Sequence, residues 1–112
     1  EIIARAQIKN NLKYVAEKVP GMDAGALRKL GDALRDKDES VVALLVSAVG
    51  EKVSLLCVCG KDAVKAGVKA GDIIKAIAPV VGGKGGGKPD SAMGGGSDVS
   101  KIDEAVKAFY NI

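Results

Sequence analysis

The sequence predicts an α/β (α+β) fold, in which helices pack on a mixed β-sheet. Two continuous aliphatic runs, residues 41–46 and 53–59, have the length and the β-branched content of buried strands. Other segments repeat apolar residues at helical spacing. The chain has only three aromatic residues, so its core must be built from Val, Leu, Ile and Ala, as is typical of helices packed on a sheet. A length of 112 residues predicts one domain.

The N-terminal part of the chain predicts a short helix, a strand and a longer helix. Residues 1–9 look helical, and the chain begins with Glu1 rather than Met. We therefore expect residues 1–9 to be the end of a preceding helical segment and residues 10–112 to form the globular domain. Residues 12–19 alternate in part and predict a strand. Asp23 is a good helix N-cap, and apolar residues recur at helical spacing after it.

The two aliphatic runs predict the centre of the sheet. Residues 41–46 are continuously apolar, which indicates a strand that is covered on both faces. Residues 53–59 predict a second strand of this kind. Because Gly50, Glu51 and Lys52 can turn the chain between them, we expect an antiparallel hairpin.

The C-terminal half predicts two helices on either side of a glycine-rich loop. Residues 61–69 are rich in Lys and Ala and predict a short helical turn. Asp72 is expected to cap the next helix, and Asp98 or Ser100 the last one. The predicted order of elements is β-α-β-β-α-Gly loop-α. No internal repeat is visible.

Composition excludes several kinds of chemistry. The chain has no histidine, so a catalytic triad or a histidine base is excluded. Cys57 and Cys59 are the only two cysteines and cannot complete a zinc site by themselves. We interpret them as reduced, buried thiols, which fits a cytoplasmic location. No apolar run is long enough to cross a membrane.

The glycine-rich segment, residues 82–96, is the feature that bears most directly on function. Lys84 and Lys88 lie among its glycines, and residues 61–88 contain six lysines against two aspartates, whereas the whole chain has a net charge of +3. Glycine-rich backbone can bring several N–H groups to one oxyanion, so the segment favours a phosphate-bearing partner. A purely structural turn and a disordered linker are the alternatives. The order of elements also allows a short strand near residues 91–93.

The same segment nearly matches a nucleotide-binding P-loop. Gly82, Gly87 and Lys88 fit the spacing, but Pro89 stands where the magnesium-binding Ser or Thr should be. A P-loop also follows a strand, whereas this segment is predicted to follow a helix. The segment therefore departs from the pattern that nucleotide hydrolysis requires, and no metal or catalytic site is predicted.

The run from Gly82 to Asp90, followed by Ala92 and Gly94-Gly95, resembles the signature of the C-terminal, DHHA1-type domain of alanyl-tRNA synthetases. Upstream, Ala70-Gly71-Asp72 and Leu27-Arg28 also lie where that family has them. Lys88 replaces the Arg that is usual in bacterial members, which keeps the charge but loses bidentate pairing. The resemblance covers roughly residues 10–112.

The resemblance implies a noncatalytic tRNA-binding domain of a synthetase that charges tRNA with alanine. It would help to position the tRNA for aminoacylation and editing, alongside other domains of the parent protein. It implies no cofactor in this domain, with ATP, and zinc as a further candidate, bound elsewhere in the parent. A homodimer through the preceding helical segment is also allowed. The expected RNA contacts are Gly82, Gly83, Lys84, Gly85, Gly86, Gly87 and Lys88, with Lys61, Lys65 and Lys69 as weaker outer contacts.

Two other functions stay open on the sequence. One is the substrate-binding domain of a DHH-family phosphoesterase, in which the same loop would hold a nucleotide phosphate. The other is a dimerisation or interaction module, in which the loop is only structural.

Overall fold

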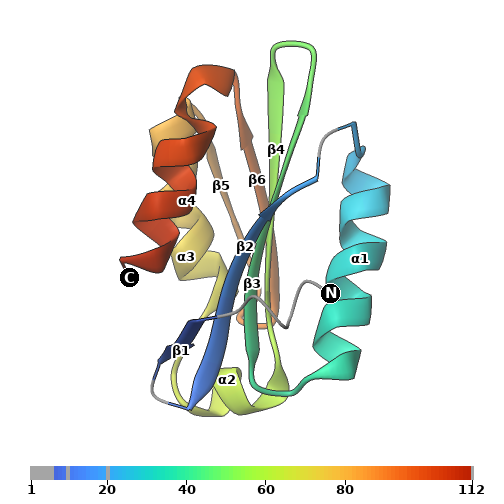
Figure 1. The fold of residues 1–112 in the computed structure, drawn as a ribbon, viewed down its shortest axis with the longest axis vertical. Helices are drawn as coiled ribbons and strands as arrows, with labels where there is room; N and C mark the ends of the chain where they lie inside the picture. The colour runs from blue at the N-terminus through green and yellow to red at the C-terminus, as the bar shows by residue number, and fades with distance from the viewer. Residues whose placement is uncertain (1–6, 10, 20, 112) are drawn as a thin grey trace.

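A six-stranded mixed sheet forms the centre of the molecule (Figure 1). The computed structural model describes residues 7–9, 11–19 and 21–111. The sheet has the spatial order β1-β2-β3-β4-β6-β5; β2 and β3 are parallel, and every other neighbouring pair is antiparallel. The strands are β1 (Gln7–Lys9), β2 (Leu12–Lys18), β3 (Val41–Val49), β4 (Lys52–Cys59), β5 (Lys84–Gly87) and β6 (Ser91–Gly96).

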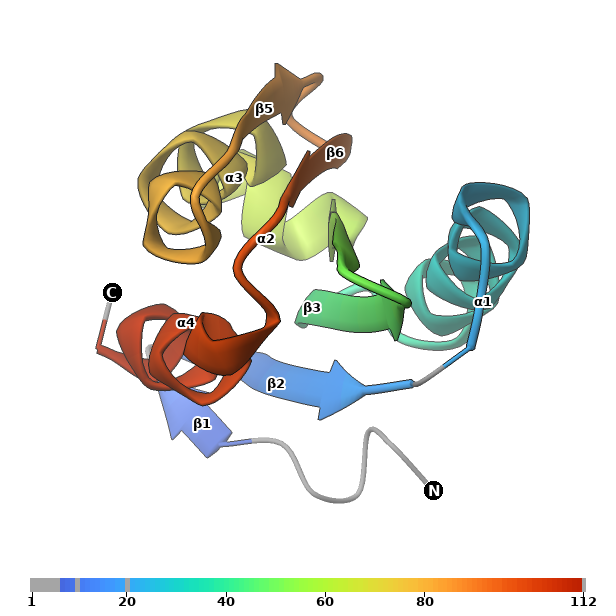
Figure 2. The same cartoon turned by 90° about the horizontal axis from the view of Figure 1, so that it is seen from above.

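Helices cover both faces of this sheet. The helices are α1 (Ala24–Lys37), α2 (Lys61–Lys65), α3 (Ala70–Ile77) and α4 (Ile102–Tyr110), with short 3₁₀ turns η2 (Ala78–Val81) and η3 (Val99–Lys101). Seen from above, α1 lies on one side of the sheet and α3 and α4 lie on the other (Figure 2). The predicted fold class, a mixed sheet packed by helices, is confirmed.

Strand β3 shows why its sequence is continuously apolar. Val42, Leu44 and Val46 pack into the core beneath α3 and α4. The alternating residues Val41, Ala43 and Leu45 pack into a second core beneath α1. Successive side chains point to opposite faces of a strand, so a strand covered on both faces needs an apolar residue at every position. The predicted antiparallel hairpin of β3 and β4 is also confirmed.

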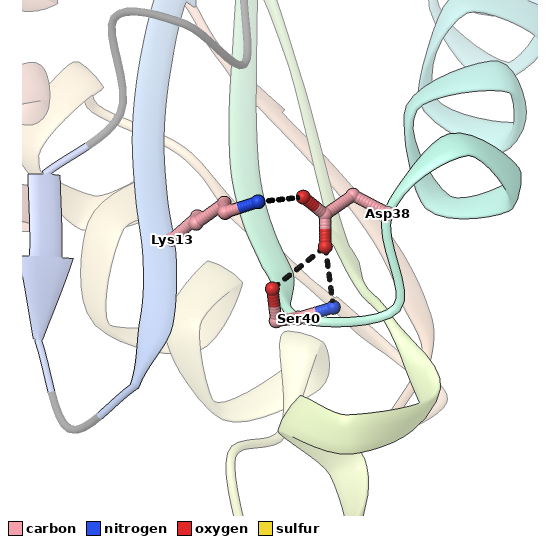
Figure 3. A network of polar contacts seen from close by, with 3 residues as sticks. All are labelled: Lys13, Asp38 and Ser40. Carbon is pink, nitrogen blue, oxygen red and sulfur yellow. Dashed lines mark hydrogen bonds and ion pairs between the residues drawn. The ribbon is translucent and has the colours of Figure 1, made fainter.

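Aspartates mark both ends of α1. The carboxylate of Asp23 accepts a hydrogen bond from the Ala26 amide at 2.8 Å, which confirms the predicted N-cap. At the other end, Asp38 accepts from the Ser40 hydroxyl at 2.6 Å and from the Ser40 amide at 2.9 Å (Figure 3). Lys13 of β2 forms an ion pair with the same carboxylate. The Asp38 side chain therefore connects the end of α1 to two neighbouring strands.

Two predictions about termini and caps were wrong. Gln7–Lys9 form strand β1, paired with β2, rather than the end of a helix; residues 1–6 lie outside the described residues. Helix α3 begins at Ala70 with Lys69 at the N-cap position, so Asp72 lies within its first turn and does not cap it. Asp98 does cap the turn that leads into α4, because its carboxylate accepts from the Ser100 amide at 3.1 Å.

Candidate nucleic-acid interface

The glycine-rich segment is a β-hairpin rather than an irregular loop. Strand β5 pairs with β6 from Lys84↔Gly95 to Gly87↔Ala92, and β6 pairs in turn with β4. The predicted order of elements lacked β5. Strand β6 covers the short strand that the sequence allowed near residues 91–93 and extends it to Gly96. Four residues of extended chain span about 13 Å, so the backbones of Lys84 and Lys88 lie at opposite ends of β5.

Three amides of the predicted anion-binding segment form hydrogen bonds within the fold. The Gly82 and Gly83 amides donate to the carbonyls of Pro79 and Ala78, at 3.1 and 3.0 Å. The Lys88 amide donates to the Ser91 carbonyl at 3.0 Å and closes the hairpin. These three donors are therefore already used within the fold.

Close packing of α3 on the hairpin gives two of the glycines a structural purpose. A Cβ placed on Gly94 would lie 2.8 Å from Cγ2 of Ile74, well inside van der Waals contact. A Cβ placed on Gly71 of α3 would lie 2.7 Å from the Gly87 carbonyl oxygen. The helix can approach the hairpin this closely only because these positions carry no side chain.

The opposite face of the hairpin is open. Helix α1 packs mainly on β3 and β4 and leaves the face of β5 and β6 on its side largely uncovered. Met93 of β6 lies on this side, because it packs against the core beneath α1. We call the surface formed by Arg28, Gly86, Lys88 and Met93, which together line one hollow, the basic face.

Two hollows lie beside the hairpin, and the smaller one, of about 400 Å³, lies in the basic face. Its position beside α1 is shown by Arg28, whose guanidinium contacts the Met93 sulfur at 3.2 Å. The hollow is lined by Arg28, Gly86, Gly87, Lys88, Ser91, Ala92 and Met93. Two cations thus border a floor with almost no side-chain bulk, which allows the backbone of a polyanion to come close.

A larger hollow of about 600 Å³ lies on the other side of the hairpin turn, between the end of α1 and α2. It combines cations, carboxylates and apolar groups. Its lining residues are Arg35, Asp36, Glu39, Cys59, Lys61, Val64, Lys65, Pro89 and Asp90. Lys88 lines the smaller hollow and Pro89 the larger one, so the hairpin turn separates the two.

Arg35 ties this turn to α1. Its guanidinium contacts the Asp90 carboxylate at 3.2 Å and the Asp90 carbonyl at 3.3 Å. It also pairs with Asp32, one turn earlier on α1, at 3.0 Å. Asp90 therefore holds the turn in place and neutralises part of the charge of Arg35.

The structure brings together only part of the predicted site. Gly86, Gly87 and Lys88 line the smaller hollow, and Lys61 and Lys65 line the larger one. Five predicted residues line neither hollow: Gly82, Gly83, Lys84, Gly85 and Lys69. Lys84 is exposed at the start of β5.

Sequence reasoning missed Arg28 and Arg35 as members of the site. They lie seven residues apart on α1, which places them on the same side of the helix two turns apart. The seven-residue spacing was the only sequence signal that the two arginines share one side of a helix. It could not assign them to the site, because nothing in the sequence showed that α1 lies beside the glycine-rich hairpin.

The two cysteines lie in the core rather than at a reactive surface. Cys57 and Cys59 are both free thiols and fully buried on the α3–α4 side of β4. A hydrogen bond with Cys59, together with burial, raises the pKa of the Cys57 thiol. Among the described residues no group of three or more His, Cys, Asp or Glu side chains could hold a metal ion. No helix in the described ranges is long and apolar enough to span a membrane.

Comparisons with known proteins give a consistent family. The chain is 48% identical over 112 residues, its full length, to an alanine–tRNA ligase of Acetivibrio thermocellus. It is 48% identical over 100 residues, or 88% of the chain, to an alanine–tRNA ligase of Streptococcus mutans. The chain spans only 13% and 11% of the length of these two relatives.

Solved structures agree with the sequence comparisons. The C-Ala domain of Aquifex aeolicus alanyl-tRNA synthetase superposes with a TM-score of 0.87, at 27% identity, over 96% of both chains. A DHH-domain structure from a member of a family of ribosomal proteins shares the fold, with a TM-score of 0.63 at 16% identity over 98% of this chain and 28% of that one. The profile of the DHHA1 domain matches residues 11–112. The chain therefore belongs to the DHHA1 domain family.

Proposed function

We propose that this chain is the tRNA-binding DHHA1 domain of an alanine–tRNA ligase and that the basic face contacts the RNA backbone. The observation that carries the proposal is a glycine-floored hollow bordered by Arg28 and Lys88. Both are exposed, and neither forms an ion pair with another described residue; Lys84, also exposed and unpaired with any described residue, would add a contact from the other end of β5. Similarity to alanine–tRNA ligases over the full chain makes tRNA the natural polyanion.

The mechanism would be electrostatic and positional. Cations that contact phosphates fix the register of an RNA without reading its sequence. A bare sheet face suits this task because bulky side chains do not hold the sugar–phosphate backbone away from the cations. Lys61 and Lys65, at the larger hollow, and Lys69, just before α3, would add outer contacts. The described aromatic side chains are buried or half-buried, so stacking on exposed aromatics is not part of this mechanism.

The parent protein would supply the chemistry. In this proposal the domain holds tRNA while other domains, which bind ATP, carry out aminoacylation and editing. A cytoplasmic location and a homodimer through a preceding helical segment remain predictions of the same proposal.

Charge reversal on the basic face tests the proposal. We expect Lys88→Glu and Arg28→Glu each to weaken binding of tRNA(Ala), and each lost phosphate contact to lower the slope of log K against log salt by about 1. The measurement is a filter-binding titration at several salt concentrations.

Lys52→Glu is the matched control, because it makes the same change in net charge at the exposed start of β4. Affinity and slope should change much less in this variant. Equal effects of Lys52→Glu and Lys88→Glu would mean that only net charge matters, and the basic face would lose its assigned role.

A further inference from the structure

We propose that the larger hollow binds an unpaired guanine nucleotide of the bound RNA. This inference rests on the proposed function, since it assumes an RNA on the basic face. It assigns a ligand to a second site, on the other side of the hairpin turn from the smaller hollow. Both the size of the hollow, about 600 Å³, and the mixture of groups around it suit a nucleotide.

The apolar part of the lining suits a flat base. The accessible apolar surface comes from Val64 of α2, which is half-buried, and from Pro89 of the hairpin turn, which is exposed. Cys59 borders the hollow but is fully buried, so it offers no surface to a ligand. A base that leaves its stack can recover contact on such a surface, as unstacked bases do in proteins that read single-stranded RNA.

Cations and carboxylates lie around this apolar surface. Lys61 and Lys65, both on α2, are exposed and form no ion pair with a described residue. They can neutralise the phosphate of a bound nucleotide. Asp36 and Glu39 are also exposed, and their carboxylates accept no hydrogen bond from a described group. A ligand for this hollow should therefore present an anion and hydrogen-bond donors together.

Guanine fits the free carboxylates better than the other bases. Its N1–H and N2–H₂ groups are adjacent donors on one edge, which a carboxylate can accept as a pair. Adenine and cytosine each place one amino donor beside a ring acceptor, and uracil places one N–H between two carbonyls, so a carboxylate meets repulsion there. Asp90 is less available for this role because Arg35 holds its carboxylate.

The hairpin turn connects this hollow with the basic face. Lys88 lines the smaller hollow, and the next residue, Pro89, lines the larger one. An RNA strand held at Lys88 therefore needs to pass only one residue to place a base against Pro89. Figure 1 shows α2 beside this end of the sheet, opposite the β3–β4 turn.

Titration of the ¹⁵N-labelled chain with 5′-GMP and 5′-AMP, followed by NMR, tests the inference. We expect GMP to shift the amide signals of residues 36–39 and 61–65 and to bind about tenfold more tightly than AMP, as one carboxylate–base pair can provide. Asp36→Asn/Glu39→Gln should abolish this preference, whereas Lys61→Ala/Lys65→Ala should weaken both nucleotides. Glu51→Gln/Glu104→Gln, which removes two exposed carboxylates elsewhere, should keep the preference.

Two results would overturn the guanine site: equal affinity for GMP and AMP, or a preference that survives Asp36→Asn/Glu39→Gln. If this happens while Lys88→Glu still lowers the salt slope for tRNA, the proposed function stands without the guanine site. If GMP selectivity holds but Lys88→Glu leaves tRNA binding unchanged, the basic-face proposal fails and the guanine site remains.

Discussion

Asp38 shows how one side chain can set both a helix end and a strand start. Hydrogen bonding from Lys13, and then from Ser40, lowers the pKa of Asp38 from 3.8 to about 2. The carboxylate is only 16% exposed, whereas the partner ammonium is 39% exposed. The ion pair lies near the surface yet is more sheltered than the pair of Lys18 with Asp103, whose side chains are 58% and 75% exposed.

We expect Asp38→Asn to lower the free energy of unfolding by about 1–2 kcal/mol at pH 7, allowing for solvent screening of Lys13. A carboxyl with a lowered folded-state pKa stabilises the fold above its unfolded pKa. This contribution should therefore be complete above about pH 4 and disappear as the pH falls toward 2. Urea unfolding between pH 7 and pH 2.5 measures it.

Asp103→Asn is the comparison for this prediction. Its pKa is also lowered, by the hydrogen bond from Lys18, but the pair is exposed and should contribute no measurable stability. If the two variants lose equal stability, burial is not what distinguishes the Asp38 interaction.

At the level of elements, sequence patterns predicted the well-packed parts and missed the glycine hairpin. Residues 41–46 and 53–59 carry side chains that reveal which faces are buried. Lys84–Gly87 has three glycines and no side-chain alternation, so neither a strand period nor a face can be read from it. Its conformation is set by β6 and α3, which lie beside it only in the folded chain.

The same reasoning applies to the candidate site. Lys88 was predicted because it lies inside the glycine signature, and Lys61 and Lys65 because they belong to the basic stretch before it. Arg28 and Arg35 come from a helix far away in the sequence, and only the tertiary fold brings them to the hairpin. A side chain contributed by a distant element has no local signal that assigns it to the site.

The contact between α3 and the hairpin gives an element-level prediction. Gly94→Ala should destabilise the fold by about 1–3 kcal/mol, because its Cβ would overlap Cγ2 of Ile74. Adding Ile74→Ala should recover part of the cost of the glycine substitution in a double-mutant cycle. Thermal or urea unfolding of the four proteins in the cycle is the measurement.

Gly25→Ala provides the matched control. Gly25 lies in the first turn of α1. A Cβ placed on it would meet only Oδ1 of the N-cap Asp23, at an ordinary contact distance of 3.5 Å. Because Ala favours helices over Gly, this variant should gain about 0.5–1 kcal/mol. A loss of stability here, or none in Gly94→Ala, would contradict the explanation by close packing.

At the scale of the whole molecule, β3 and β4 separate two cores. One core lies beneath α3 and α4 and includes Phe109; the other lies beneath α1 and includes Leu27. The central strands belong to both, so loss of either core exposes the same strands. We therefore expect the domain to unfold as one unit.

The buried thiols report on this cooperativity. Cys57 and Cys59 lie on β4 with no exposed area, so a thiol reagent should modify them only after global unfolding. Under native conditions the free energy of opening derived from their modification rates should equal that from urea unfolding. Faster reaction of Cys59 alone would indicate a local opening of the α2 end and contradict a single cooperative unit.

Strand β5 ends the sheet on one side, and it is only four residues long, rich in glycine and followed directly by Lys88. An edge strand this short, with little β propensity and a charged residue at each end, is a poor template for pairing with a strand of another polypeptide. The glycines that leave room for α3 therefore also protect the domain against edge-to-edge aggregation at the high concentrations that crystallisation and NMR require.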